Sequence, residues 1–235
     1  MSKTALVTGA SSGIGLAVAG KLLDQGYSVT GLARDFSKVE SNEKVEKMSQ
    51  QRVDLSDLNQ LPNILKKESL DCAFDVLVLN AGYGRFGGVE QFSHQQIQHM
   101  VDTNLVSNLF LIKHFLPKLK KQGWGDIVII GSESALQGAR QGAVYCATKF
   151  ALRGLAQSLR HDCSISGIRV MLVNPGPVET DFFNDLNFAP QEGSDFVIDP
   201  VNVADIIFTA LSQPRHVVAD EINIQPIKRS FQKKK

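Results

Sequence analysis

The sequence predicts a single α/β domain in which helices cover both faces of an open, doubly wound parallel β-sheet of about seven strands. Three observations indicate this fold class. Short apolar runs alternate with amphipathic helical patterns along the chain. The runs are rich in Val, Ile and Leu without clean alternation, as in parallel strands that are covered on both faces. A chain of 235 residues with 43% hydrophobic residues can build one large core but is short for two domains.

The predicted elements follow one another as strand and helix. Seven apolar runs are predicted strands: 4–9, 27–33, 51–55, 74–82, 126–132, 169–176 and 221–226. Five segments with apolar residues at three- and four-residue spacing are predicted helices: 13–25, 57–68, 94–121, 143–164 and 200–213. Gly26 is well placed to end the first helix. The alternation implies right-handed strand-helix-strand units and therefore a doubly wound sheet.

Residues 178–199 are the one long segment between late strands that lacks clear periodicity. A loop of this length in a compact domain is usually a functional lid or a poorly ordered segment. We favour a substrate lid, because the segment leaves the C-terminal end of a strand, where open α/β sheets bind ligands.

The formal net charge of +1 gives no general attraction to nucleic acid or to acidic membranes, so neither is an expected partner. Charge is uneven only near the end, where five basic residues and no acidic one follow Glu221. We expect one domain over 1–227 and a basic tail over 228–235. The tail could touch a phosphate-rich partner, but we favour a solvated, partly disordered segment and assign it no function.

Cys72, Cys146 and Cys163 show no paired-ligand spacing and leave one cysteine over in any disulfide scheme. This pattern suits a reducing compartment, so we expect a cytoplasmic protein without a metal site. Glycine interrupts the N-terminal apolar run, and no cleavage pattern follows, so no signal peptide is predicted. The longest apolar runs fall far short of the ~20 residues that span a bilayer, which predicts a soluble protein.

A glycine-rich turn, T-G-A-S-S-G-I-G from Thr8 to Gly15, joins the first predicted strand to the first helix. Glycines allow a tight turn and close approach to a ligand, and the N–H groups at the helix start can hold a pyrophosphate. The spacing G-x-x-x-G-x-G differs from the commoner dinucleotide fingerprint, so the turn alone is a weak signal.

Tyr145 and Lys149 are four positions apart in a helical pattern, so their polar ends reach the same surface. Two interpretations stay open from this spacing. One is a half-buried tyrosine beside an exposed lysine. The other is a lysine whose charge lowers the pKa of the phenol below its ordinary value of about 10, which would make it an acid or base near neutral pH.

Five motifs in one order make the chain resemble the short-chain dehydrogenase/reductase family. They are T-G-x-x-x-G-x-G at 8–15, N-A-G at 80–82, Ser132, Y-x-x-x-K at 145–149 and P-G-x-x-x-T at 175–180. The resemblance covers essentially the whole chain and implies a Rossmann-type fold. It also favours the second interpretation of Tyr145 and Lys149.

The resemblance implies a nicotinamide dinucleotide cofactor. The glycines would take its diphosphate, the N-A-G segment would lie beside the adenosine ribose, and the P-G-x-x-x-T segment would lie along the nicotinamide. Asp54 would face the adenine amine, the alternative being a helix cap. The implied cofactor-binding residues are Gly9, Ser11, Ser12, Gly13, Ile14, Gly15, Asp54, Leu55, Asn80, Ala81, Gly82, Tyr145, Lys149, Pro175, Gly176, Val178 and Thr180.

Arg34 predicts a preference for NADP(H) over NAD(H). Ala33 stands where an NAD enzyme usually carries an acidic residue for the ribose 2′-hydroxyl. A guanidinium at the next position suits the 2′-phosphate of NADP. Asp35 complicates this prediction, because its carboxylate could pair with Arg34 or contact the ribose.

The implied catalytic residues are Asn104, Ser132, Tyr145 and Lys149. In the family mechanism Tyr145 exchanges a proton with the substrate oxygen, Lys149 lowers the pKa of Tyr145 and holds the nicotinamide ribose, and Ser132 hydrogen-bonds the same oxygen. Ser134 is a neighbouring alternative to Ser132. Asn104 would distort its helix so that a water links Lys149 to solvent, the alternative being a surface polar residue.

The substrate implied by the resemblance is a small carbonyl or alcohol compound. The length, the lid and the C-terminal segment look like the NADP-dependent 3-hydroxy acid (serine/allo-threonine) dehydrogenases. Arg140 could pair with a substrate carboxylate, the alternative, which we favour, being an ordinary exposed loop arginine. Phe182 and Phe183 could screen the substrate or simply anchor the lid. Alternatives are a general carbonyl or 3-oxoacyl reductase and a non-catalytic NADP-binding redox regulator. A homotetramer or homodimer through helices 94–121 and 143–164 is expected.

Overall fold

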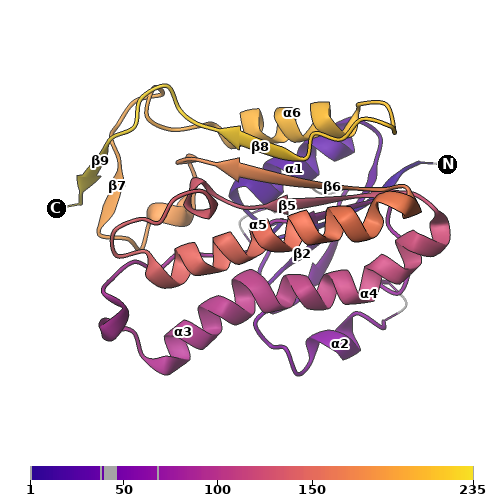
Figure 1. Cartoon of the computed structure of the whole chain (residues 1–235), viewed down its shortest axis with the longest axis horizontal. Coiled ribbons are helices and arrows are strands. Elements are labelled where there is room, and N and C mark those ends of the chain that lie inside the picture. The colour runs from indigo at the N-terminus through magenta and orange to yellow at the C-terminus, as the bar shows by residue number, and fades with distance from the viewer. Residues whose placement is uncertain (1, 38, 40–46, 68, 235) are drawn as a thin grey trace.

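A seven-stranded parallel sheet organises the chain, in the order β3-β2-β1-β4-β5-β6-β8 (Figure 1). The computed structural model describes residues 2–37, 39, 47–67 and 69–234. The strands are β1 (Thr4–Thr8), β2 (Ser28–Ala33), β3 (Ser49–Arg52), β4 (Val76–Leu79), β5 (Gly125–Ile130), β6 (Ile168–Pro175) and β8 (Glu221–Ile224). The predicted α/β fold with seven strands is confirmed. The strand order reverses at β1: the chain first adds β2 and β3 on one side of β1 and then returns to add β4 on its other side, parallel to it.

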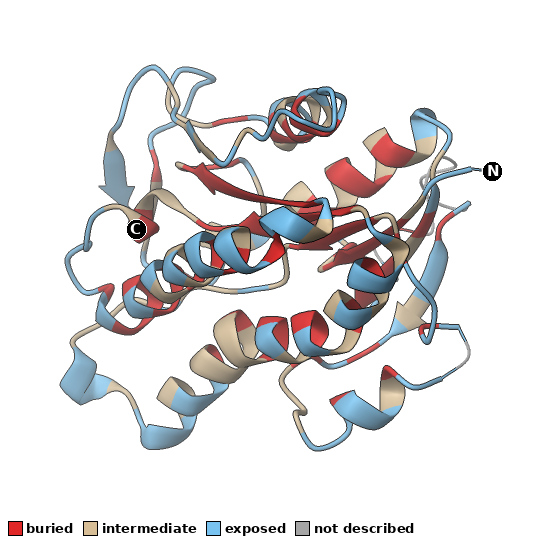
Figure 2. Ribbon diagram, turned by 45° about the vertical axis from the view of Figure 1, so that its right-hand side comes forward, coloured by how far each residue is buried: buried red, intermediate tan, exposed pale blue. Residues whose placement is uncertain are grey.

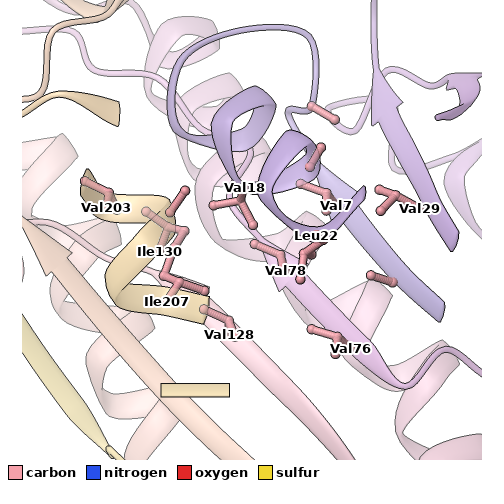
Figure 3. Close-up of a cluster of buried hydrophobic side chains, with 14 of the residues drawn as sticks. Val7, Val18, Leu22, Val29, Val76, Val78, Val128, Ile130, Val203 and Ile207 are labelled. Carbon is pink, nitrogen blue, oxygen red and sulfur yellow. The ribbon is translucent and has the colours of Figure 1, made fainter. Parts of the chain in front are cut away.

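Helices cover both faces of this sheet (Figure 1). They are α1 (Gly13–Asp24), α2 (Leu61–Ile64), α3 (His94–Val101), α4 (Ser107–Gln122), α5 (Ala143–Cys163) and α6 (Pro200–Leu211). On one face α1 and α6 pack through side chains such as Val18 and Ile207 against the strands (Figure 3). On the other face α4 and α5 pack through Phe115 and Leu152. The central strands β1, β4, β5 and β6 are therefore buried on both sides, which Figure 2 shows and which explains their largely apolar sequences, whereas the edge strands β3 and β8 are partly exposed.

Two predicted elements have clearly different bounds in the structure. Strand β3 covers Ser49–Arg52 rather than 51–55, and the helix predicted over 57–68 is reduced to α2, with residue 68 outside the described part. The carboxylates of Asp54 and Asp57 explain the difference. They accept hydrogen bonds from the backbone N–H groups of Ser56 at 2.9 Å and Gln60 at 3.1 Å, which hold the chain in turns.

The predicted helix 94–121 is interrupted by one turn of π-helix at Asp102–Val106, which lies between α3 and α4. The first helix ends as expected, because Gly26 has a φ of +79° beyond the last turn of α1.

The C-terminal tail is more ordered than expected. Residues Phe231–Lys233 form β9, which pairs antiparallel with β7 (Phe188–Pro190) at the end of the molecule where β6 points (Figure 1). Lys234 donates a hydrogen bond to the carbonyl oxygen of Asn184 at 2.9 Å. The expectation of a disordered tail is wrong for these residues, and its last residue, 235, lies outside the described part. Three residues pairing with a distant segment leave no periodic signal in a sequence.

We expect Ser93→Ala to lower the free energy of unfolding by about 1 kcal/mol. Ser93 caps α3: its hydroxyl accepts from the N–H of Gln96 at 3.2 Å, and the Gln96 side chain accepts from the N–H of Ser93 at 3.0 Å. Urea unfolding of the variant measures the loss. Ser69→Ala, on an exposed turn, is the control, and an equal effect of both substitutions would contradict the role of the cap.

Candidate active site

The glycine-rich turn after β1 leaves the start of α1 open to an anion. Gly9 and Gly13 have φ values of +65° and +52°, and a Cβ on Gly15 would collide with the carbonyl oxygen of Gly9. Ser12, the residue before α1, makes no side-chain capping hydrogen bond, and no acidic residue lies in the first turn. The helix N-terminus therefore offers partial positive charge and close backbone approach, which fits the diphosphate of a dinucleotide.

Asn80 connects this turn to the end of β4. Its side-chain amide donates to the carbonyl oxygens of Thr8 at 2.9 Å and Gly9 at 3.3 Å. The hydroxyl of Thr8 accepts from the N–H groups of Asn80 and Ala81, each at 2.9 Å. The C-terminal ends of β1 and β4 are thus fixed to each other. Thr8 is a supporting residue that the sequence interpretation did not select.

A cavity of about 790 Å³ opens at the C-terminal ends of the strands. Of the sequence-predicted site residues, it is lined by Gly9, Ser11, Ser12, Gly13, Ile14, Arg34, Asp54, Leu55, Asn80, Ala81, Gly82, Ser132, Tyr145, Lys149, Pro175, Gly176, Val178 and Thr180. Two predicted residues do not line it. Gly15 is packed behind the glycine turn, and Asn104 is completely buried in the π-helical turn. Residues from five separate motifs therefore meet at one cavity.

Tyr145 lies on the first turns of α5, and only 6% of its surface is exposed. Burial raises the pKa of its phenol to about 12, while the neighbouring Ser132 hydroxyl acts in the opposite direction. The phenol is therefore protonated at neutral pH. The second interpretation of the sequence expected a pKa below the ordinary value; the pKa lies above it instead, because desolvation of the phenolate is the largest effect.

Ser132 follows β5 and caps a short 3-10 helix, Glu133–Ala135. Its hydroxyl accepts from the N–H of Ser134 at 3.1 Å, and its own N–H donates to Asn174 Oδ1 at 3.3 Å. Because the Ser132 hydroxyl also acts on the Tyr145 phenol, the structure favours Ser132 over Ser134 as the hydroxyl beside the phenol.

Lys149 lines the cavity but is largely buried, with 6% of its surface exposed. Its Nζ donates to the carbonyl oxygen of Ile130 at 3.0 Å and lies 5.8 Å from the centre of the Tyr145 ring. Burial lowers the pKa of the ammonium to about 8. An exposed lysine beside a half-buried tyrosine, one of the two interpretations of the sequence, is therefore wrong.

Asn104 lies close to Lys149. Its side chain binds both backbone groups of Tyr83, accepting from the N–H at 3.0 Å and donating to the carbonyl oxygen at 2.9 Å. It also donates to Thr148 Oγ1 at 3.2 Å. The alternative of a surface polar residue is wrong, since Asn104 has no exposed surface. The expected local distortion of its helix is present as the π-helical turn.

We expect Lys149→Met to stabilise the protein by about 2 kcal/mol at neutral pH. The lysine pKa falls from an unfolded value near 10.5 to about 8 in the folded protein, so folding a charged Lys149 is unfavourable below pH 8. The loss of one hydrogen bond to Ile130 offsets part of the gain. Because the penalty fades as pH rises from 8 towards 10.5, the stabilisation should fade over the same range. Urea unfolding across pH measures it, and a pH-independent difference would contradict the burial of a charge.

Arg34 and its neighbours lie at the far end of the cavity. The Asp35 carboxylate accepts from the N–H of Ser37 at 3.0 Å and from the Ser37 hydroxyl at 2.6 Å. These bonds engage Asp35 in its own turn rather than with Arg34. Among the described residues Arg34 makes no hydrogen bond or ion pair, so its guanidinium is exposed and available to an anion.

Asp54 lines the cavity and also caps the following turn. Its carboxylate accepts from the Ser56 hydroxyl at 2.7 Å. Partial burial acts to raise the pKa of this carboxyl, but the Ser56 hydrogen bonds and the charge of Arg34 outweigh it and hold the pKa below its usual value.

The segment after β6 closes the other side of the cavity. Thr180 caps a short 3-10 helix, Asp181–Phe183, by accepting from the N–H of Phe182 at 3.3 Å. A Cβ added to Gly13 would lie 2.8 Å from Thr180 Cγ2. The glycine turn and the lid segment are therefore in direct contact across the site.

Sequence reasoning did not select several residues that line the cavity: Phe86, His99, Thr103, Glu133, Phe188, Arg229 and Phe231. Phe86 lies in the loop after β4 and Phe188 in the segment 178–199, neither of which has a periodic sequence pattern, and Arg229 and Phe231 lie in the tail that we expected to be partly disordered. No signal in the sequence joins these segments.

Among the described residues no group of three or more His, Cys, Asp or Glu side chains could hold a metal ion. No helix in the described part of the chain is long and apolar enough to cross a membrane.

The fold and the site define an α/β oxidoreductase in which a glycine turn and a Ser-Tyr-Lys group share one cavity. The chain belongs to the short chain dehydrogenase family, whose profile matches residues 3–190. It is 32% identical over 230 residues to an uncharacterised oxidoreductase of Staphylococcus epidermidis, with 96% of this chain and 97% of the relative covered. The family and the relatives' names make the chain an enzyme that acts on alcohol or carbonyl groups.

Solved structures show the same fold. The alcohol dehydrogenase of the archaeon Thermococcus sibiricus, complexed with 5-hydroxy-NADP, is 26% identical and has a TM-score of 0.84, with 98% of this chain and 99% of that chain covered. Serine dehydrogenase from Escherichia coli is 24% identical with a TM-score of 0.82, covering 97% and 99% of the two chains. The second likeness shows the fold alone.

Proposed function

We propose that the protein is an NADP-dependent oxidoreductase that transfers a hydride between nicotinamide and a carbonyl or secondary alcohol. The observation that carries the proposal is the convergence of Ser132, Tyr145 and Lys149 on a cavity that continues to the glycine turn. A bound nicotinamide supplies or accepts the hydride. The chain supplies the acid, the hydrogen-bond donor and the positive charge around the reacting oxygen.

In this proposal Tyr145 donates its proton to the substrate oxygen during reduction and takes one from the alcohol during oxidation. Its raised pKa keeps the phenol protonated and ready to donate. The Ser132 hydroxyl hydrogen-bonds the same oxygen and stabilises the charge that develops there. Lys149, still mostly charged at neutral pH, favours the phenolate as it forms and holds the ribose, and Asn104 positions the water that returns a proton.

The preference for NADP over NAD rests on Arg34. Its guanidinium is exposed at the end of the cavity, and Asp35 is engaged by Ser37 rather than by Arg34. The Thermococcus alcohol dehydrogenase was complexed with an NADP derivative, and a putative gluconate 5-dehydrogenase that is 26% identical was solved with NADP. These likenesses support the same cofactor for this chain.

Two substrate classes follow from different observations. A 3-hydroxy acid, the class that the sequence predicts, needs a cation for its carboxylate, and Arg140 lines the cavity and is exposed. A general carbonyl reductase, the alternative, is favoured by the aromatic side chains around Tyr145, which suit an uncharged apolar substituent.

A cytoplasmic homodimer or homotetramer is part of the proposal. Leu109 on α4 is 41% exposed, and the apolar side chains of Ile97, Val101 and Val144 line a shallow surface depression between α3 and α5. Such apolar helix surfaces typically pack against a second copy. All three cysteines of the chain are free, which is compatible with a reducing compartment.

A screen of ketones, thioesters and hydroxy acids, followed by cofactor absorbance with NADPH or NADP⁺, tests the proposal. Turnover of a carbonyl or alcohol that depends on NADP(H) supports it. No turnover in either direction across the whole panel, by a protein that binds NADPH, would favour the third hypothesis, a non-catalytic redox regulator.

A further inference from the structure

Five phenylalanine rings line the cavity next to Tyr145: Phe86, Phe182, Phe183, Phe188 and Phe231, here called the aromatic wall. We infer that the wall selects an uncharged carbonyl compound that carries an aromatic or similarly bulky apolar substituent. The inference rests on the proposed function, and it names a substrate class and the residues that determine it.

The wall begins at the reacting group. The Phe86 ring lies 5.3 Å from the Tyr145 ring, and the Phe182 ring lies 5.7 Å from it, centre to centre. A carbonyl oxygen that accepts the Tyr145 proton therefore places its two substituents beside these rings. Aromatic pairs at such separations gain affinity beyond the area that they bury.

The wall continues outward without interruption. Phe188 lies 5.1 Å from Phe86 and 5.8 Å from Phe231, and Phe183 lies 5.1 Å from Phe182. The rings come from the loop after β4, the lid segment and the tail. Because β7 and β9 are paired, Phe188 and Phe231 are fixed to each other although more than forty positions separate them. The C-terminal strand is thus a part of the substrate site.

The exposed fraction of the five ring residues distinguishes between two roles, binding of a substrate and simple hydrophobic anchoring of the segment. Core phenylalanines such as Phe74 and Phe115 are 3% and 1% exposed. None of the five wall rings is buried, and Phe231 is 40% exposed. Rings that only anchored the lid would be covered by protein, as the core rings are. Uncovered apolar surface inside a cavity is typical of a site for an apolar group.

The charges beside the wall disfavour a carboxylate on the substrate. Arg229, the basic residue that the tail contributes to the cavity, is paired with Glu133 at 3.2 Å. Asp181 and Asp185, on the same segment as Phe182 and Phe183, line the cavity as well. These two carboxylates disfavour an anionic group beside the wall, whereas an uncharged substituent avoids the repulsion. Arg140 also lines the cavity, but it lies outside the wall on the loop before α5, so a substrate carboxylate would pair there rather than at the wall.

Reduction of four ketones by NADPH tests the inference: acetophenone, cyclohexyl methyl ketone, acetone and 3-oxobutanoate. Burial of a phenyl or cyclohexyl group should raise kcat/KM for the first two about 100-fold over acetone. Phe231→Ala and Phe188→Ala should each reduce the selectivity for acetophenone over acetone about 10-fold, mainly through KM. Phe150→Ala, on the exposed side of α5 and outside the cavity, should leave that selectivity unchanged.

Equal kcat/KM values for acetone and acetophenone, a preference for 3-oxobutanoate, or equal losses for both ketones in the Phe231 and Phe188 variants would overturn the inference. Calorimetric binding of acetophenone to the NADPH complex of Tyr145→Phe separates it from the proposed function. If acetophenone binds Tyr145→Phe and binds more weakly to the double variant Tyr145→Phe/Phe231→Ala, the substrate class is supported. If the unmutated protein at the same time turns over no ketone, the proposed function is overturned. Turnover of 3-oxobutanoate without binding of acetophenone supports the proposed function and overturns the inferred substrate class.

Discussion

Replacing Tyr145 by phenylalanine is expected to lower turnover about 100-fold or more, because the variant cannot exchange a proton with the substrate oxygen. The ring, its burial and its contacts with Phe86 and Phe182 are kept, so the fold and the cavity should persist. Affinity for NADPH should change by no more than about twofold, because only the phenol hydroxyl is lost. Steady-state rates and NADPH fluorescence titration measure the two quantities.

Two further variants sharpen this result. Lys149→Ala should reduce both turnover and cofactor affinity, because Lys149 is proposed to act on the phenol and to hold the ribose. Tyr27→Phe, which removes a phenol hydroxyl outside the cavity, is the matched control and should change neither. Retention by Tyr145→Phe of more than about a tenth of the turnover, with chemistry rate-limiting, would refute the assigned role.

Replacing Arg34 by alanine is expected to weaken the use of NADP about 10- to 100-fold and to leave the use of NAD almost unchanged. A hydrogen bond to a charged group contributes roughly 1.5 to 3 kcal/mol, and a guanidinium can form two of them with a phosphate. Exposure of Arg34 keeps the effect within this range. The structure weakens one objection, because the Asp35 carboxylate is hydrogen-bonded to Ser37 and, among the described residues, forms no ion pair with Arg34.

The measurement is kcat/KM for both cofactors in the unmutated protein and the variant. Arg52→Ala is the matched control, since Arg52 is exposed at the end of the adjacent strand β3 and does not line the cavity. Equal use of the two cofactors by the unmutated protein, or a loss of both in Arg34→Ala, would show that Arg34 does not recognise the 2′-phosphate.

The main sheet could be predicted because its signal is local. Each buried strand, such as β4 or β6, is a short run of apolar residues, and both faces of the sheet are covered, so no alternation is needed to recognise it. Element ends were less predictable, as at α2, because the carboxylates of Asp54 and Asp57 compete with the helix for backbone groups.

The meeting of Ser132, Tyr145 and Lys149 at one cavity could be predicted because the three residues have a fixed spacing in the chain. Their pKa values could not, because these depend on burial: desolvation is the largest cause of the shift at both Tyr145 and Lys149. Likewise, no spacing indicates that Asn104 binds the backbone of Tyr83.

Contacts between distant segments also could not be predicted. Phe231 reaches the aromatic wall only because β9 pairs with β7. The buried carboxylate of Asp126 forms ion pairs with the buried Arg169 at 2.6 Å and with the exposed Arg215 at 2.8 Å, which join β5, β6 and the segment after α6. Each of these residues alone resembles an ordinary surface charge in the sequence, and only the folded chain brings them together.

Transfer of deuterium from NADPH labelled with two deuterons at nicotinamide C4 tests the central claim most directly. The carbonyl compound that the screen finds most active is reduced, and the product alcohol is analysed by mass spectrometry and NMR. The account predicts one deuteron per molecule, on the former carbonyl carbon, and almost no labelled alcohol from Tyr145→Phe over the same time. Alcohol that carries no deuterium, or labelled alcohol formed equally fast by Tyr145→Phe, would contradict hydride transfer assisted by Tyr145.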